Sequence, residues 1–132
     1  MILTFLTFNL ADGLAPPDQV VRFLRQSGAD VIGLQEVAEP QADAIAWRLR
    51  DVYPYQVLHP FGIAGKGLLS RFPVRAPELL PLFPARPDIA AIIEAPGGAF
   101  VTIVAHPPPP RYRGTHRFRH NAARHAQIDA LL

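Results

Sequence analysis

Two short apolar runs, residues 2–8 and 29–35, enclose an amphipathic segment, and this order constrains the fold more than any other feature of the sequence. Both runs are rich in β-branched, aromatic or aliphatic residues and are short enough for buried strands. Between them, Pro17 supplies a helix start, apolar residues up to Leu24 recur at helical spacing, and Gly28 ends the pattern. A strand, a helix and a second strand in this order predict a parallel pair joined by a crossover helix.

The remainder of the chain predicts an α/β domain in which short strands follow a second helix. The predicted helix covers residues 40–52, and the segment 96–98 predicts a hairpin turn. Five strands are predicted: 55–59, 67–71, 78–83, 89–95 and 99–105. Residues 111–120 form a polar, basic connection, and 121–132 has helical spacing.

Length and composition limit the class of protein. A chain of 132 residues has room for one domain with one real core, and 49% hydrophobic with 18% charged residues is a globular composition. The sequence has no cysteine, so a metal site would need oxygen or imidazole ligands. We find no basic leader and no apolar stretch long enough to span a membrane, and we expect a cytoplasmic protein.

Three polar residues stand where predicted strands stop: Asn9, Glu36 and His106. The ends of strands are where α/β sheets place their sites, because the strand is rigid and the loop that follows is accessible. The run 107–110 is all proline, which holds the preceding residue extended and predicts His106 as the last residue of its strand.

Each of these residues also has a purely structural interpretation. Asn9 precedes Ala-Asp-Gly and can act as a turn former. A single Glu36 after a strand can be a solvated residue, and His106 can be a satisfied histidine at a sheet edge. The three together point to a site more strongly than any one of them.

Four ordered segments carry a resemblance to a known family. They are TFNL at 7–10, ADVIGLQEV at 29–37, GKGLLSRFPV at 65–74 and VTIVAH at 101–106. In order and spacing they closely resemble successive motifs of the endonuclease/exonuclease/phosphatase family, which has the DNase I-like fold. The resemblance continues to the helical segment at the end of the chain.

The resemblance implies a role for each residue at a strand end. Glu36 matches the carboxylate that binds Mg²⁺ or Mn²⁺, Asn9 a partner of the metal or the scissile phosphate, and His106 a contact to the phosphate oxygens. These residue types suit the chemistry, because Mg²⁺ prefers oxygen ligands and histidine can donate to developing negative charge. We assign Ser70 and Arg71 to packing, with a phosphate contact by Arg71 as the alternative.

The sequence also departs from the family pattern. Family members use an Asp-x-Asn strand end and a late Asp-His pair, and neither occurs here. After His106 the only acid is Asp129, and His116, His120 and His125 have no neighbouring aspartate and are interpreted as solvated. We therefore expect residues 1–132 to be a single partial domain that lacks its C-terminal half through a frameshift, an early stop or an incomplete sequence, and that is inactive alone.

The resemblance implies half of a four-layer α/β/β/α sandwich, in which a mixed sheet carries helices on one face. We expect the chain to supply one sheet-and-helix layer, whose open inner face favours a homodimer. The leading hypothesis for function is a divalent-metal-dependent phosphoester hydrolase, with nucleic acid or a small or lipid phosphoester as substrate. The alternative is a non-catalytic module that binds nucleic acid or an anion through the basic segment 111–124. The purely structural interpretation of this segment is a solvated loop.

Overall fold

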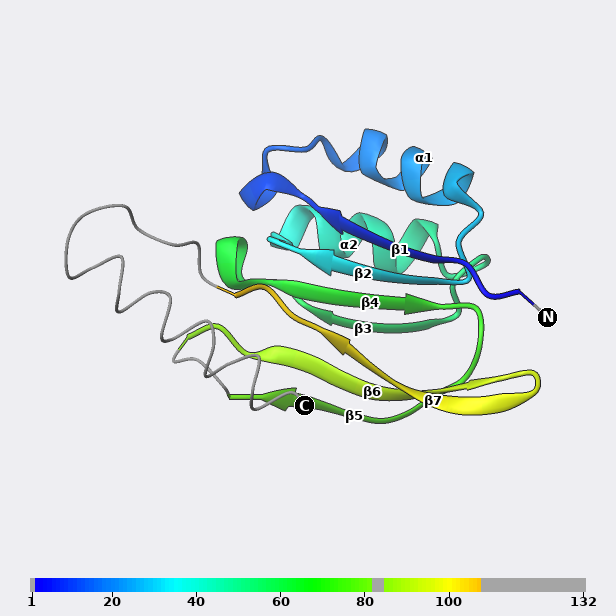
Figure 1. Cartoon of the computed structure of the whole chain (residues 1–132). Helices are drawn as coiled ribbons and strands as arrows, with labels where there is room; N and C mark the ends of the chain where they lie inside the picture. The colour runs from blue at the N-terminus through cyan, green and yellow to red at the C-terminus, as the bar shows by residue number, and fades with distance from the viewer. Residues whose placement is uncertain (1, 82–84, 108–132) are drawn as a thin grey trace.

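The computed structural model describes residues 2–81 and 85–107, which form two sheets and two α-helices (Figure 1). The predicted basic segment 111–124 and the predicted helix 121–132 lie outside the described residues. In chain order the elements are β1 (Phe5–Asn9), η1 (Ala11–Gly13), α1 (Pro17–Ser27), β2 (Val31–Gln35), α2 (Glu39–Arg48), β3 (Tyr55–His59), η2 (Gly62–Ala64), β4 (Lys66–Ser70), β5 (Val74–Leu80), β6 (Asp88–Ala95) and β7 (Gly98–Val104).

The first sheet has the strand order β1-β2-β4-β3 and is mixed. Strands β1 and β2 are parallel, with Asn9 opposite Gln35, and α1 is the crossover between them, as the sequence predicts. Strand β4 is antiparallel to both β2 and β3. Because β4 runs the opposite way, its first residue, Lys66, lies beside Gln35 at the carboxyl end of β2.

Both α-helices cover one face of this sheet. Helix α1 begins with Pro17 and ends at Gly28, whose φ of 67° is the left-handed conformation that glycine adopts at low cost. The core on this face joins both helices to alternate sheet residues: Val20, Val21 and Leu24 of α1, Ala42 and Ile45 of α2, and Ile32, Leu34 and Leu69 of the sheet. The alternation follows from the two-residue period of a strand.

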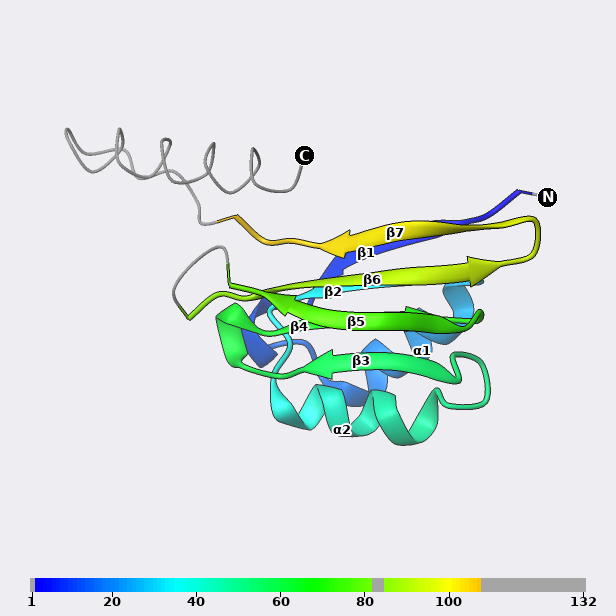
Figure 2. The same ribbon diagram turned by 90° about the horizontal axis from the view of Figure 1, so that it is seen from below.

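The second sheet, β5-β6-β7, is antiparallel and packs on the opposite face of the first (Figures 1 and 2). Its core residues Ile89, Ile93 and Val104 meet Val31 and Leu68 of the first sheet. The two sheets come close at Gly33, where an added Cβ would lie 3.3 Å from Val104. A third layer therefore lies on the side of the first sheet away from the helices.

This arrangement confirms the mixed α/β architecture with helices on one face, and it corrects one expectation. The chain does not supply a single sheet-and-helix layer, because its last three described strands form a second sheet. The strand predicted at 78–83 begins earlier, at Val74, and tolerates Pro77 through a register shift between Arg75 and Glu78. Proline is accepted there because an edge strand with a bulge need not donate every backbone N–H.

No helix within the described residues is long and apolar enough to cross a membrane.

Candidate active site

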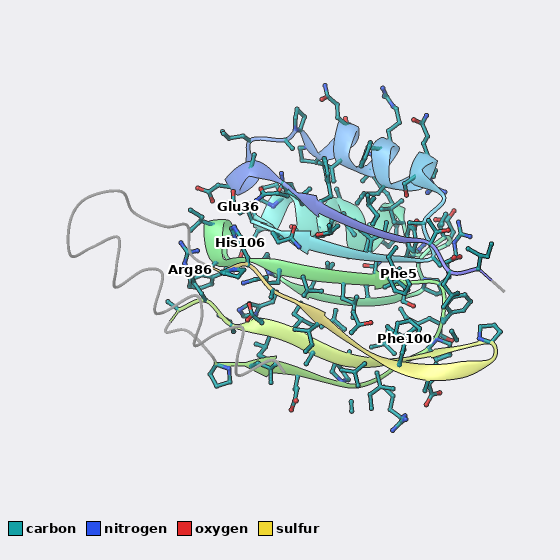
Figure 3. All side chains as sticks on the ribbon, in the orientation of Figure 1. Phe5, Glu36, Arg86, Phe100 and His106 are labelled. Atoms are coloured by element: carbon teal, nitrogen blue, oxygen red, sulfur yellow. The ribbon has the colours of Figure 1, made fainter. Side chains whose placement is uncertain are left out.

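The predicted site residues come from three strand ends at one edge of the two sheets. Asn9 is the last residue of β1, Glu36 directly follows β2, and His106 lies two residues after β7 ends at Val104. The prediction that His106 ends its strand is therefore wrong by two residues. Figure 3 shows Glu36 and His106 lying together at this edge, on the side where η2 is found.

Glu36 and His106 are brought into close proximity from different sheets. His106 Nε2 lies 3.7 Å from Glu36 Oε1, and their side chains are 21% and 18% exposed. This distance is longer than a hydrogen bond, so the two groups are neighbours with space to share a ligand atom. A carboxylate and an imidazole that are both partly buried and both accessible are suited to contacting one bound group.

The environment favours the neutral form of His106. Burial is the largest cause and lowers its pKa, while the negative charge of Glu36 opposes it. The positive charges of Lys66 and Arg86 lower the pKa further, and the Ile63 backbone raises it without reaching the geometry of a hydrogen bond. The net pKa is lower than the ordinary value of 6.5, so the imidazole is neutral near pH 7 and can donate one proton in a hydrogen bond.

Glu36 is held in a conformation that a non-glycine residue rarely adopts. Its φ of 55° is left-handed, and the next residue, Val37, is tied on both sides to the loop that contains η2. The Phe61 N–H donates to the Val37 carbonyl at 2.9 Å, and the Val37 N–H donates to the Gly65 carbonyl at 3.3 Å. Residues in such conformations persist where the surrounding structure fixes them, and they concentrate at functional sites.

Gly65 has a steric reason to be glycine. A Cβ at this position would lie 2.1 Å from the Val37 carbonyl oxygen and 2.6 Å from the Phe61 nitrogen. Only a residue without a side chain lets the loop come this close to the strand end that carries Glu36.

Asn9 lies at the same sheet edge, in a turn. Its Oδ1 accepts a hydrogen bond of 2.7 Å from the Ala11 N–H, which is the turn-forming role weighed in the sequence. Among the described residues, Asn9 makes no hydrogen bond with Glu36 or His106. The side chain is exposed, and an amide oxygen has a second lone pair, so the turn does not exhaust its capacity as an acceptor.

Lys66 and Asp88 form a buried pair that the sequence interpretation missed. Both side chains are fully buried, with Lys66 Nζ 3.4 Å from Asp88 Oδ1. Nζ also donates to the carbonyls of Pro87 at 3.1 Å and Ala64 at 3.3 Å. Burial lowers the pKa of Lys66, Asp88 opposes this, and Arg86 lowers it further. The available signal was the position of the single lysine of the sequence, between two glycines in an apolar strand.

Ser70 and Arg71 lie at the opposite end of the sheet from Glu36, because Ser70 is paired with Val31 at the start of β2. The Ser70 hydroxyl donates to the Phe72 carbonyl and accepts from the Phe72 N–H. Arg71 Nη1 lies 3.4 Å from Asp30 Oδ1. These contacts agree with the packing role and give no support to the alternative of a phosphate contact by Arg71.

Comparison with known proteins identifies the chain at the level of family. Residues 6–132 match the sequence profile of the Endonuclease/Exonuclease/phosphatase family. The chain belongs to this family. No curated protein sequence matches it.

Three solved structures are similar to this chain in fold. The crystal structure of humanized D. rerio TDP2 with 14 mutations has a TM-score of 0.77 at 17% identity and covers 98% of this chain and 54% of that chain. Truncated Caenorhabditis elegans TDP2 has a TM-score of 0.69 at 19% identity, with 98% and 53% covered. D. rerio TDP2 complexed with single strand DNA product has a TM-score of 0.64 at 15% identity, with 76% and 44% covered. This chain thus spans about half the length of these structures, and the likeness establishes the fold.

The donors at the site fit a hard divalent cation of the kind that the endonuclease/exonuclease/phosphatase family implies. Glu36 offers a carboxylate and Asn9 an amide oxygen, from adjacent strand ends, and Mg²⁺ commonly uses one or two carboxylates with water and substrate oxygens. The described residues contain no group of three or more His, Cys, Asp or Glu side chains that could hold a metal. The fit is therefore one of ligand type, with a single carboxylate.

Proposed function

We propose that the chain carries part of the active site of a divalent-metal-dependent phosphoester hydrolase. The observation that supports this most strongly is the 3.7 Å approach of His106 Nε2 to Glu36 Oε1, in a chain of the endonuclease/exonuclease/phosphatase family. Residues 1–132 form one partial domain in this proposal. Glu36 and Asn9 would hold Mg²⁺ or Mn²⁺, and His106 would contact the phosphoryl group.

The residues of the chain contribute binding and orientation. The left-handed backbone at Glu36 and the hydrogen bonds of Val37 hold Glu36 at the end of β2. Little conformational entropy is therefore lost when a ligand binds to its carboxylate. A neutral His106 donates a hydrogen bond to a phosphoryl oxygen, where negative charge increases during the reaction. The cation, when bound, supplies Lewis-acid polarisation and neutralises charge.

The Asp-x-Asn and Asp-His motifs of the family do not occur in this sequence, and we propose that residues 1–132 alone are inactive. Groups that act in general acid-base catalysis contribute about 10²–10⁴-fold each. Uncatalysed phosphoester hydrolysis is very slow, so even a sizeable residual acceleration stays below ordinary detection.

Nucleic acid is the substrate class that we propose to test first. The D. rerio TDP2 structure with single strand DNA product is a solved relative in fold, and a polynucleotide supplies the phosphodiester that the Glu36 and His106 groups suit. A chromogenic phosphodiester tests the chemistry without requiring recognition of a base.

The direct test of this proposal is binding of Mn²⁺, measured by electron paramagnetic resonance, for the wild type, Glu36→Ala and Glu78→Ala. Glu78 is an exposed carboxylate on β5 and serves as the matched control. We expect weak binding by the wild type and by Glu78→Ala, and none by Glu36→Ala. Equal binding by all three proteins would contradict the assignment of Glu36.

The same proteins are then assayed with bis(4-nitrophenyl) phosphate and a single-stranded oligonucleotide in the presence of Mg²⁺ or Mn²⁺. We expect no turnover by any of them. Turnover by the wild type that Glu36→Ala abolishes would uphold the hydrolase assignment and show that residues 1–132 suffice for catalysis.

A further inference from the structure

Gln41, in the first turn of α2, is a buried polar residue whose hydrogen bonds reach two loops at the candidate site. Its Oε1 accepts from the Ala38 N–H at 3.1 Å, and its Nε2 donates to the carbonyls of Ala15 at 2.8 Å and Leu10 at 3.3 Å. Capping of the N-terminus of α2 accounts for the bond to Ala38. It does not account for the two bonds from Nε2, which join α2 to the loop after β1.

The two loops that Gln41 joins carry the amide and the carboxylate of the candidate site. Asn9 directly precedes Leu10, and Glu36 lies two residues before Ala38. Leu10 is held from both sides, because its N–H donates to the carbonyl of the last residue of β2 at 2.9 Å and its own carbonyl accepts from Gln41. One buried amide group therefore bonds a neighbour of each proposed metal ligand.

Both loops have a left-handed backbone at residues other than glycine. The φ angle is 56° at Ala11, 53° at Asp12 and 55° at Glu36. Such conformations are unfavourable and persist where the surrounding structure fixes them. The two carbonyls that accept from Gln41 Nε2 lie on either side of Ala11 and Asp12, and the N–H bonded to its Oε1 follows Glu36 by two residues. The hydrogen bonds of Gln41 thus restrain the strained parts of both loops.

The loops are also in direct contact with each other. A Cβ at Gly13 would lie 2.9 Å from the Cβ of Ala38, so the loop after β1 packs closely against the start of α2. Helix α2 is fixed in turn, because Ala42 and Ile45 are part of the core. Gln41 therefore connects both loops to a rigid element.

We infer that Gln41 is a positioning residue, which holds Asn9 and Glu36 in one arrangement through their loops. Groups that orient the ligands of a metal affect its affinity although they do not touch it. The inference rests on the proposed function for the identity of the bound cation. The restraint on the two loops is independent of any cation.

Gln56 of β3 provides a matched control. Its Nε2 also donates to two backbone carbonyls, those of Ile45 at 3.3 Å and Tyr53 at 3.0 Å. The variants are Gln41→Met and Gln41→Asn, with Gln56→Met and Gln56→Asn as controls. Methionine keeps the length of the side chain and removes the amide. Asparagine is one methylene shorter, so its amide cannot reach both loops.

The first measurement is amide hydrogen exchange of the full chain by NMR, without metal. The Ala11 N–H donates to Asn9 Oδ1 at 2.7 Å, and the Val37 N–H donates to the Gly65 carbonyl at 3.3 Å, so these amides report on the two loops. We expect both to exchange at least about tenfold faster in Gln41→Met than in Gln56→Met, because lost hydrogen bonds favour local opening.

The second measurement is Mn²⁺ binding by electron paramagnetic resonance. We expect the Gln41 variants to bind roughly tenfold to a hundredfold more weakly than the wild type, the usual effect of removing a group that orients metal ligands. The Gln56 variants should match the wild type.

The outcomes separate this inference from the proposed function. Equal exchange of Ala11 and Val37 in the Gln41 and Gln56 variants would overturn the inference. Glu36-dependent Mn²⁺ binding that the Gln41 variants keep at wild-type affinity would also overturn it, and the proposed function would stand. If the wild type binds no Mn²⁺, the metal assignment of the proposed function fails and the exchange rates alone decide the positioning role. Circular dichroism checks each fold, and if Gln41→Met does not fold, Gln41→Asn carries the test.

Discussion

Lys66 of β4 and Asp88 of β6 form a fully buried ion pair, 3.4 Å apart, that connects the two sheets directly behind the candidate site. Buried pairs do not add much stability compared with apolar residues, but removing one partner leaves an uncompensated charge. Lys66 also donates to the carbonyls of Ala64, in η2, and Pro87, just before β6. Loss of its side chain therefore removes a hydrogen bond from each of these two segments.

We therefore expect Lys66→Met to lower the free energy of unfolding by about 3 kcal/mol, the lower part of the range for a broken buried pair. Asp88 also has an interaction besides the one with Lys66. Urea denaturation provides the measurement. Arg75→Met, which breaks the exposed pair with Glu94, should cost less than about 1 kcal/mol. A loss equally small for Lys66→Met would show that the buried pair is not needed for the fold.

The loop at Gly65 gives a second prediction. Gly65→Ala should destabilise the protein by about 1–3 kcal/mol, because the new methyl group collides with the Val37 and Phe61 backbone. Gly28→Ala is the comparison, since nothing lies within 4 Å there and only the left-handed φ opposes the change. Its cost should be about 1 kcal/mol. If thermal denaturation shows the two variants to be equally stable, the close approach at Val37 is not rigid.

The third prediction concerns pH. The folded-state pKa of His106 is below its ordinary value, mainly through burial, so the unfolded chain takes up a proton on this residue at higher pH than the folded chain. The resulting contribution to stability is present above the unfolded pKa near 6.5 and is lost as pH falls through the folded pKa.

His106→Asn should accordingly show a shallower loss of unfolding free energy than the wild type when urea denaturation is repeated at decreasing pH below 6.5. His59→Asn is the matched control, since it removes another described histidine, which lies on β3. Parallel pH profiles for the wild type and His106→Asn would contradict the proposed burial of the neutral imidazole.

Self-association remains a prediction, now with a more specific surface. The second sheet covers part of the inner face, and an apolar groove of about 350 Å³ remains between β1, β2 and β7, lined by residues that include Phe5, Gly33 and Ile103. Phe5, which lines this groove, is 56% exposed. We expect dimers at tens of micromolar in light scattering, and monomers for Phe5→Lys, because a charge is costly in an apolar contact. Monomeric wild type would remove this expectation.

The fold could be predicted where local sequence decides the structure. The apolar runs at β1 and β2 and the stop at Gly28 predict the strand-helix-strand unit, and Pro96 with Gly97 predicts the β6–β7 hairpin. The assignment of these last strands to a second sheet could not be predicted, because the same apolar pattern suits either face.

The site shows the same division. The positions of Glu36 and His106 after strands could be predicted from the sequence, and the family resemblance implies roles for them, but their approach to each other depends on how the two sheets pack. The pairing of Lys66 with Asp88 depends on the same packing. Residues that are far apart in sequence and that meet only through such packing leave no local periodic signal.

At Glu36, the residue that would best suit the left-handed backbone is not the residue that supplies the carboxylate of the candidate site. Glycine is the residue that adopts this φ of 55° at the lowest cost, so a glutamate at this position raises the local conformational energy. A substitution that relieves the backbone also deletes the acidic group. Selection for thermal stability alone would therefore favour replacement of Glu36. Variants stabilised in this way should be tested for loss of ligand binding.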